Sequence, residues 1–244
     1  MPTLIPNLEE ALVLVQRATR TILQAYEANN RKPSVSVTLE QLCDSIDQMM
    51  RFALRLERET IGSTPTAEEI SHLGDRGLML LDDLLDWSTR LLTEDASRNL
   101  ETAALVIAQW VLQHQGELRR LDLIATACMH VVGGARSPGV LEYFAAFIGR
   151  MAEATAHIIR QDPDKTNPNR PWRLLHLYRG IAAVRSHNPR LMEEIFEDLS
   201  RQLPEDAPGF FAEIMQQTTS QPCPEATRAI VGRYFDRWAR PRMH

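Results

Sequence analysis

Three aspartates in the first half of the chain have a spacing that could hold a metal ion. Asp82, Asp83 and Asp86 spell D-D-x-x-D inside a segment whose leucines recur at helical intervals. Residues three or four apart share one face of a helix, so carboxylates at this spacing could converge on a hard cation such as Mg²⁺. The sequence therefore offers one candidate metal site, built from a single helix.

This motif resembles the aspartate-rich motif with which isoprenoid and terpenoid synthases hold magnesium and a diphosphate. The resemblance implies a magnesium-dependent diphosphate enzyme that uses Asp82, Asp83 and Asp86. Those enzymes carry a second metal motif on a facing helix, and neither a second D-D-x-x-D nor an N-D-x-x-S-x-x-x-E occurs in this chain. We favour a solvated helix face, opposite the leucine stripe, in which Asp86 pairs with Arg90. The enzyme remains the alternative.

A second candidate surface is the basic and aromatic part of the second half. Residues 160–190 hold seven bases against two acids, with aromatic side chains between them. Arginine beside aromatic residues is typical of binding hot spots. The simpler interpretation, in which the aromatics are core and the arginines solvate the helices, is favoured on composition. If the surface does bind a partner, the predicted contact residues are Trp172, Arg173, His176, Arg179, Arg233, Arg237 and Arg240.

No other pattern in the sequence points to catalysis, so we assign no catalytic residue, cofactor or metal. Cys128 and His130 are two residues apart, which on a helix turns their side chains away from each other. The glycine-rich segment 133–139 precedes a predicted helix and could offer backbone amides to a phosphate. It lacks the lysine of a P-loop and follows no strand, so we expect a helix C-cap at Gly133 and a turn.

Charge is unevenly distributed along the chain. The 244 residues carry a formal net charge of −5, and residues 1–100 hold sixteen acids against ten bases. The remainder holds sixteen acids and seventeen bases. An acidic balance disfavours non-specific binding to nucleic acid or to an anionic membrane. Nucleic-acid binding through the arginine-rich half is therefore the weakest of the functional hypotheses.

Cysteine usage and the amino terminus predict a cytoplasmic protein. Cys43, Cys128 and Cys223 are odd in number and far apart, which argues against a disulfide framework. Acids at positions 9 and 10 interrupt the apolar run that a signal peptide needs. The use of arginine for all but two of the basic residues is typical of a GC-rich bacterial genome.

The elements that position these residues are predicted to be helices. Capping-box spacings at Asn7, Thr38 and Thr66 each precede an apolar pattern of helical period. In the second half, prolines mark the helix starts. The segments 100–112 and 121–132 are apolar on all sides and too short to span a bilayer, so they are predicted to form a buried central hairpin over residues 97–134.

These patterns predict an all-α protein of about ten helices in antiparallel hairpins. The expected architecture is a tetratricopeptide-like or HEAT-like array or a large orthogonal bundle. An N-terminal region (1–162) and C-terminal hairpins (163–244) are expected to pack as one continuous domain. The leading functional hypothesis is a non-enzymatic interaction or scaffold module that binds a protein or peptide. Self-association through the arginines of the last helix, against the acidic first half of a second copy, is also predicted.

Overall fold

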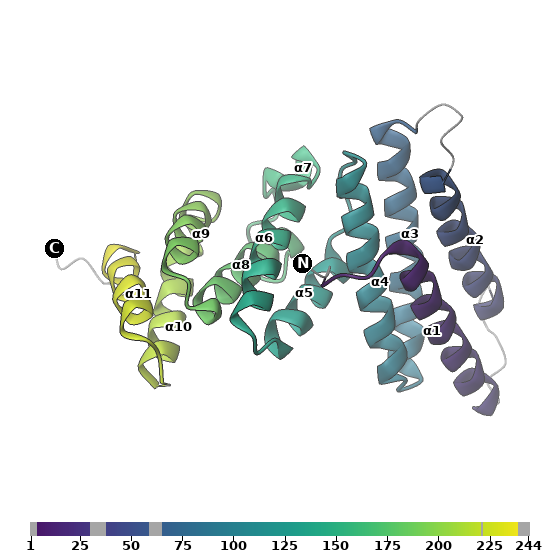
Figure 1. Ribbon diagram of the computed structural model, residues 1–244, viewed down its shortest axis with the longest axis horizontal. Helices are drawn as coiled ribbons and strands as arrows, with labels where there is room; N and C mark the ends of the chain where they lie inside the picture. The colour runs from purple at the N-terminus through teal and green to yellow at the C-terminus, as the bar shows by residue number, and fades with distance from the viewer. Residues whose placement is uncertain (1–3, 30–37, 59–64, 221, 239–244) are drawn as a thin grey trace. The chain divides into compact units, whose positions relative to one another are not determined.

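Helices dominate the structure. The computed structural model describes residues 4–29, 38–58, 65–220 and 222–238. Within these ranges the chain forms eleven helices and no strand, apart from one isolated backbone bridge between Leu118 and Thr155 (Figure 1). The predicted all-α class with about ten helices is confirmed. None of the helices in these ranges combines the length and the apolar character needed to cross a bilayer.

The helices range from a single turn of four residues to 24 residues. The first five are α1 (Leu8–Ala28), α2 (Leu39–Arg58), α3 (Ala67–Arg90), α4 (Glu94–Gln113) and α5 (Asp122–Gly134). The others are α6 (Pro138–Glu153), α7 (His157–Arg160), α8 (Pro171–Ser186), α9 (Pro189–Gln202), α10 (Ala207–Ser220) and α11 (Glu225–Trp238).

Contacts divide the chain into two compact units. Unit 1 comprises Met1–Ala127 and Ala154–Gln161, and unit 2 comprises Cys128–Glu153 and Asp162–His244. The chain therefore passes between the units within α5, after α6 and after α7. Residues 128–153, placed by the sequence with the N-terminal region, cluster with unit 2.

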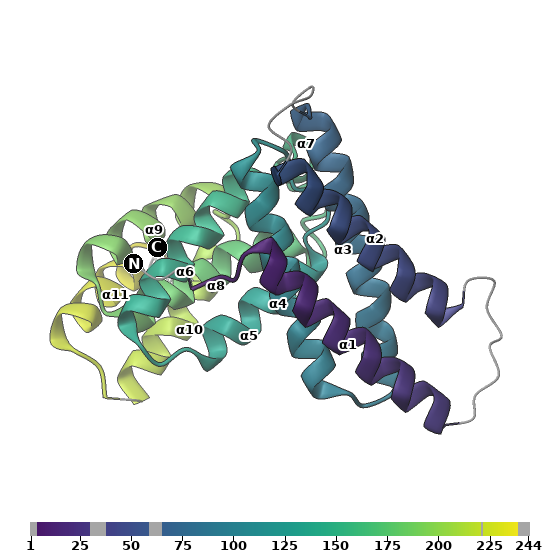
Figure 2. The same cartoon turned by 45° about the vertical axis from the view of Figure 1, so that its right-hand side comes forward.

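Unit 1 contains a four-helix bundle. Helix α1 packs against α2 and α4, and α3 packs against the same two helices, so the four form a closed ring. Figure 1 and Figure 2 show that successive helices of this ring run in alternate directions. In such a bundle every helix buries an apolar stripe in one shared core.

The predicted helix starts of unit 1 are confirmed at the three capping boxes. The Asn7 side chain accepts from the N–H of Glu10 at 2.9 Å, and the Glu10 carboxylate accepts from the N–H of Asn7 at 2.9 Å. Thr66 and Glu69 make the same exchange, as does the pair that begins at Thr38. Each cap satisfies amides that the first turn leaves unpaired, which is worth about 0.5–2 kcal/mol.

Helix α4 supplies the centre of this bundle. From Leu100 to Val111 nearly every side chain is buried, and Ile107 is only 2% exposed. The burial expected for residues 100–112 is thus confirmed. The helices that cover α4 are α1 and α3, which lie earlier in the chain than the hairpin partner expected from the sequence.

A glycine allows α3 to approach α4 closely. Gly74 is buried in α3, and a Cβ atom added there would overlap Cγ2 of Val111 on α4. Glycine inside a helix costs about 1 kcal/mol relative to alanine. Its use at this position is therefore explained by the short separation of the two helices.

Replacing Gly74 with alanine should lower the free energy of unfolding by about 1–3 kcal/mol, because the added methyl group overpacks the α3–α4 contact. Urea denaturation followed by circular dichroism measures this change. Val111→Ala should cost less in the Gly74→Ala background than in the wild type, since it removes the clashing methyl groups. A gain in stability from Gly74→Ala would contradict the close approach.

The connection between α3 and α4 turns at a leucine in the left-handed region. Leu92 has a φ of 57°, and it is 86% exposed. This conformation costs a residue with a Cβ atom about 1–2 kcal/mol, and glycine is the usual residue just after a helix end. Because the Leu92 side chain is so exposed, it makes few contacts that could offset the free-energy cost of this backbone conformation.

Leu92→Gly should therefore raise the free energy of unfolding by about 0.5–1 kcal/mol, after allowance for the greater freedom of glycine in the unfolded chain. Leu92→Ala is the matched control, since it removes the same exposed side chain but keeps the Cβ atom. The urea midpoint should rise for glycine and not for alanine. Equal midpoints for the two variants would show that the backbone conformation carries no cost.

Unit 2 is built from helices that follow one another in order. Helix α6 packs on α8, α8 on α9, α9 on α11 and α10 on α11. Helices α6, α8 and α9 each begin at the proline predicted to start them. Four aromatic rings, with neighbouring centroids 5.0–6.1 Å apart, join the last three helices. They belong to Phe196, Phe210, Phe211 and Tyr234.

The carboxyl end of α5 is capped differently from the prediction. Gly133 lies inside the helix, and no glycine among the described residues has a positive φ, so the expected glycine C-cap is wrong. Instead, the guanidinium of Arg185 on α8 donates to the carbonyl oxygens of Val132, Gly133 and Ala135. A cation at this end also offsets the helix dipole. The carboxyl end of α5 is thus capped by a side chain 50 residues away in the sequence, and not by a local turn.

Candidate functional site

A pocket lies between α2 and α3 in unit 1. Its volume of about 450 Å³ falls in the range of pockets that hold small ligands or large side chains. The residues that line it come from the first half of α2, with its cap, and from the second half of α3. They are Thr38, Leu42, Ser45, Met79, Leu80, Asp83, Asp86, Trp87 and Arg90, and we call this site the α2–α3 pocket.

Apolar side chains form much of the α2–α3 pocket. Leu42 and Leu80 are buried, whereas Met79 is 36% exposed and Trp87 is half-buried. The Trp87 ring meets Tyr26 of α1 edge-on, with the ring centroids 5.4 Å apart. That contact orients the indole. Methionine and tryptophan left accessible in this way are enriched where proteins bind partners.

Charged side chains complete the lining. Asp83 and Asp86 are exposed, and Asp86 pairs with Arg90 across 3.5 Å. The Arg90 guanidinium also lies over the Trp87 ring, 5.9 Å from its centroid. A carboxylate and an aromatic face together bind a cation. Within the chain, the cation that binds both the Asp86 carboxylate and the Trp87 ring is the guanidinium of Arg90.

Asp82 belongs to a different environment. It is absent from the lining of the α2–α3 pocket. Asp82 is exposed like its two neighbours, but partial desolvation is the main cause that raises the pKa of its carboxyl, followed by the negative charges of Asp122 at the start of α5 and of Asp86 and Asp83. Asp82 therefore lies toward α5, while Asp83 and Asp86 lie toward α2.

The D-D-x-x-D motif does not fit a magnesium centre. Only Asp83 and Asp86 share the pocket, and in the described ranges no group of three or more His, Cys, Asp or Glu side chains is placed to hold a metal ion. A diphosphate-bound Mg²⁺ needs several converging oxygen ligands. The Asp86–Arg90 pair expected of a solvated face is present. We derive no enzymatic step from these aspartates.

Two of the predicted partner-binding residues are core residues. Trp172 and His176 are 4% and 3% exposed, and their ring centroids lie 4.4 Å apart. Buried side chains offer no surface, which corrects the partner role considered for them. Nε2 of His176 makes no hydrogen bond within the described part of the chain. Burial lowers the pKa of His176 to about 4.

The predicted arginines of α8 are paired within unit 2. Arg173 donates to Asp206 across 2.6 Å, and Arg179 donates to Asp198 across 2.5 Å. The Arg179 side chain is only 12% exposed. Neither guanidinium forms part of an open basic stripe, which is what a nucleic-acid surface requires.

The arginines of α11 pair with the neighbouring helix. Arg233 contacts Glu193, and Arg237 donates to Glu197 across 2.8 Å, both on α9. These two arginines remain more than half exposed. Arg240, the third member of the predicted set, lies outside the described residues.

Arg170 forms a buried ion pair that no sequence pattern indicated. Its side chain is 8% exposed and donates to both carboxylate oxygens of Asp162, at 2.5 and 2.9 Å. A further N–H donates to Asp206 at 2.9 Å. These carboxylates raise the pKa of Arg170, with Asp162 the largest cause. Asp162 and Asp206 lie 8 and 36 residues from Arg170, and neither spacing belongs to a helical pattern that the sequence would reveal.

Burial of His176 should make the protein sensitive to mild acid. Between pH 6.5 and 4 the unfolded chain binds a proton at this histidine that the folded chain does not, so stability is full above pH 6.5 and falls toward pH 4. The loss should be about 3 kcal/mol. Urea unfolding between pH 4 and 7.5 tests it: His176→Leu should flatten the dependence. Identical pH dependence in the variant and the wild type would contradict this account.

Comparison with known protein families, with curated proteins and with solved structures finds no match to this chain. No residue therefore takes a role from a relative. In the α2–α3 pocket, accessible apolar and charged side chains meet.

Proposed function

We propose that the protein is a non-enzymatic interaction module that binds an apolar and basic segment of a partner protein in the α2–α3 pocket. The observation that carries the proposal is the combination, in one pocket, of accessible Met79 and Trp87 with the carboxylates of Asp83 and Asp86. Each property selects one feature of the partner.

The apolar lining selects a large apolar side chain. A volume of about 450 Å³ accommodates one or two such side chains. Burying apolar surface contributes about 25 cal/mol per Å², and tryptophan often dominates the energy of an interface. Because Trp87 is already held by Tyr26, its ring need not be ordered when the partner binds.

The charged lining selects a cation next to that apolar side chain. Arg90 shows the chemistry within the chain, since its guanidinium pairs with Asp86 and lies over the Trp87 ring. Its side chain is 62% exposed, so a partner's arginine or lysine can take its place or bind Asp83 beside it. The excess of acids in residues 1–100 favours the same kind of partner.

A protein segment suits the pocket better than a metal-bound diphosphate. Asp82, which the diphosphate alternative requires, lies outside the lining. A helical or extended peptide can place an apolar anchor and a basic residue one turn apart, which matches the distribution of side chains along α3.

Selection from an unbiased library of displayed peptides tests the proposal. Peptides retained by the wild-type protein should combine a large apolar residue with a nearby Arg or Lys. Their dissociation constant, measured by fluorescence anisotropy, should rise about tenfold or more in Met79→Asp and in Asp83→Lys, a loss of about 1.4 kcal/mol or more.

Glu57→Lys is the matched control for Asp83→Lys. It makes the same change in charge at an exposed position of α2, twelve residues beyond Ser45 and so about 18 Å along the helix. It should leave the affinity nearly unchanged. If it weakens binding as much as Asp83→Lys does, the effect is one of net charge, and the proposed contact is wrong.

A further inference from the structure

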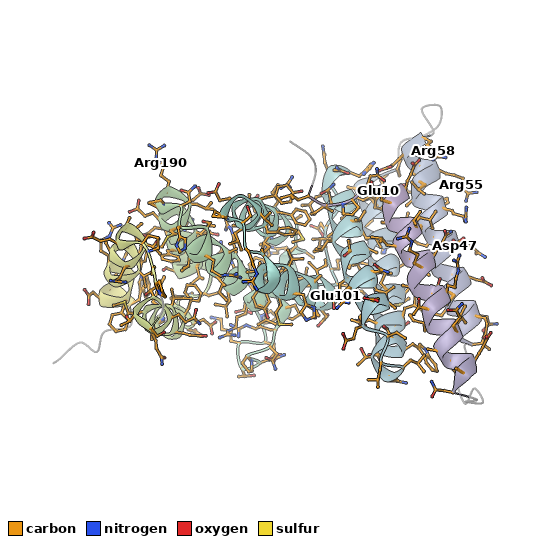
Figure 3. The ribbon with its side chains drawn as sticks, turned by 60° about the horizontal axis from the view of Figure 1, so that its bottom comes forward. Glu10, Asp47, Arg55, Arg58, Glu101 and Arg190 are labelled. Atoms are coloured by element: carbon orange, nitrogen blue, oxygen red, sulfur yellow. The ribbon has the colours of Figure 1, made fainter. Side chains whose placement is uncertain are left out.

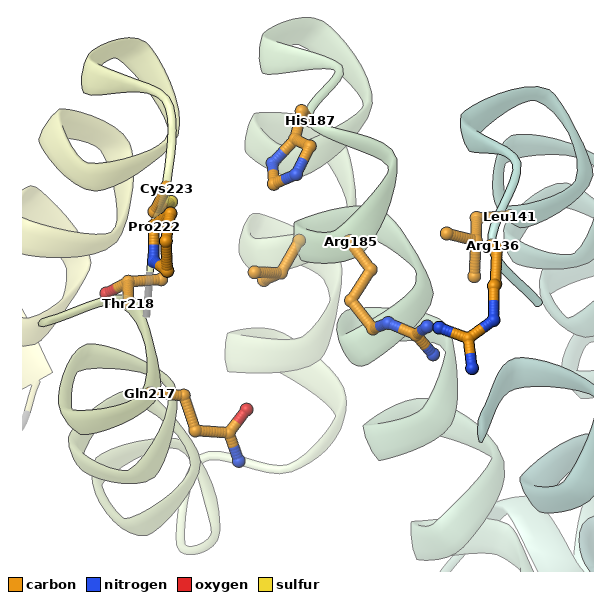
Figure 4. Close-up of a pocket in the computed structure, with 9 residues that line it drawn as sticks. Arg136, Leu141, Arg185, His187, Gln217, Thr218, Pro222 and Cys223 are labelled. Atoms are coloured by element: carbon orange, nitrogen blue, oxygen red, sulfur yellow. The ribbon is translucent and has the colours of Figure 1, made fainter. Parts of the chain in front are cut away.

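A second pocket lies entirely within unit 2, with a volume of about 300 Å³ (Figure 4). Its lining includes two arginines and a histidine, and no carboxylate among the described residues. The polar side chains that bear on its chemistry are Arg136, Arg185, His187, Gln217 and Thr218. A pocket that gathers cations without acids is suited to an anion.

Arg185 is held in place by the backbone. Its guanidinium donates to the carbonyl oxygen of Ala135 at 2.6 Å and to that of Val132, at the end of α5. No carboxylate in the described part of the chain pairs with it. Carbonyl groups fix its position but carry only partial charge. The guanidinium therefore keeps positive charge that a bound anion can use.

Arg136 is the second arginine of the pocket, and it is unpaired within the described residues. It is exposed, and it makes no hydrogen bond or ion pair with any described residue. In Figure 4 its guanidinium and that of Arg185 point toward each other at one side of the pocket. Two like charges brought together repel each other, and an anion between them relieves that repulsion. A guanidinium also offers paired N–H donors that match the oxygens of a phosphate.

His187 lines another part of the pocket, apart from the two guanidinium groups (Figure 4). It follows α8 with a φ of 56°, a conformation that turns the chain sharply after the helix. Its Nδ1 lies 3.2 Å from the hydroxyl oxygen of Thr227 on α11, which fixes the ring. Nε2 has no hydrogen-bond partner in the described residues.

We propose that this pocket binds a phosphate group, with Arg136 and Arg185 as the ligands. A dianion suits two guanidinium groups better than a monoanion does. The volume admits a phosphate with a small organic substituent. The inference is independent of the proposed function, because it concerns another unit of the chain and a ligand of opposite charge.

Calorimetric titration with inorganic phosphate at fixed ionic strength tests the site. The wild-type protein should show saturable binding. Arg136→Gln should weaken the affinity about tenfold or more, because it removes a charge-assisted pair of hydrogen bonds. The matched control is Arg190→Gln: Arg190 is exposed at the start of α9, makes no ion pair with a described residue, and points away from the ribbon (Figure 3). It should leave phosphate binding unchanged.

Acetate, titrated in the same buffer, separates phosphate from carboxylate ligands and should bind at least about tenfold more weakly. Equal binding of acetate and phosphate would overturn the assignment to phosphate. Absence of saturable binding by the wild type, or equal losses in Arg136→Gln and Arg190→Gln, would overturn the site itself. Because Arg136 is exposed, its replacement should leave the circular dichroism spectrum unchanged, and binding can be compared in folded protein.

Discussion

A helical segment without a polar face is stable in water only when other helices cover it on every side, and α4 is such a segment from Leu100 to Val111. Within unit 1, α1 and α3 provide most of that cover, and the glycine at position 74 lets α3 come close enough to do so. Helix α2 then completes the ring by packing on α1 and α3. Its contact with α3 is less extensive than that between α3 and α4, and the α2–α3 pocket lies at this contact.

Internal ion pairs decide which arginines of unit 2 are available to ligands. Arg170, Arg173 and Arg179 bind carboxylates of the same unit. A buried pair such as Arg170–Asp162 need not add stability, but the loss of one partner costs about 3–5 kcal/mol because the other charge stays buried. These arginines are therefore part of the structure. Arg136, which has no such partner among the described residues, is free to bind an anion.

Local patterns in the sequence were sufficient to predict the helices. Capping boxes and first-turn prolines act within four residues, so they can be read without knowledge of the fold. It was harder to predict which side chains are buried and which are exposed. Trp172 and His176 have the composition of a binding surface, yet they are buried, because burial depends on which helices pack over them. Asp82 and Asp83 are adjacent in sequence, but only Asp83 lines the pocket.

The backbone bridge at Leu118 has a consequence for the order in which the chain can fold. The N–H of Leu118 donates to the carbonyl of Ala154 at 2.8 Å, and its carbonyl accepts from the N–H of Ala156 at 2.9 Å. Leu118 is itself almost fully buried. During synthesis these partners appear only after all of α5 and α6 has been made. A ribosome-bound chain that ends before residue 154 therefore holds the bundle helices but lacks the partners of both Leu118 backbone groups, and these hydrogen bonds form only once residues 154–156 have been made.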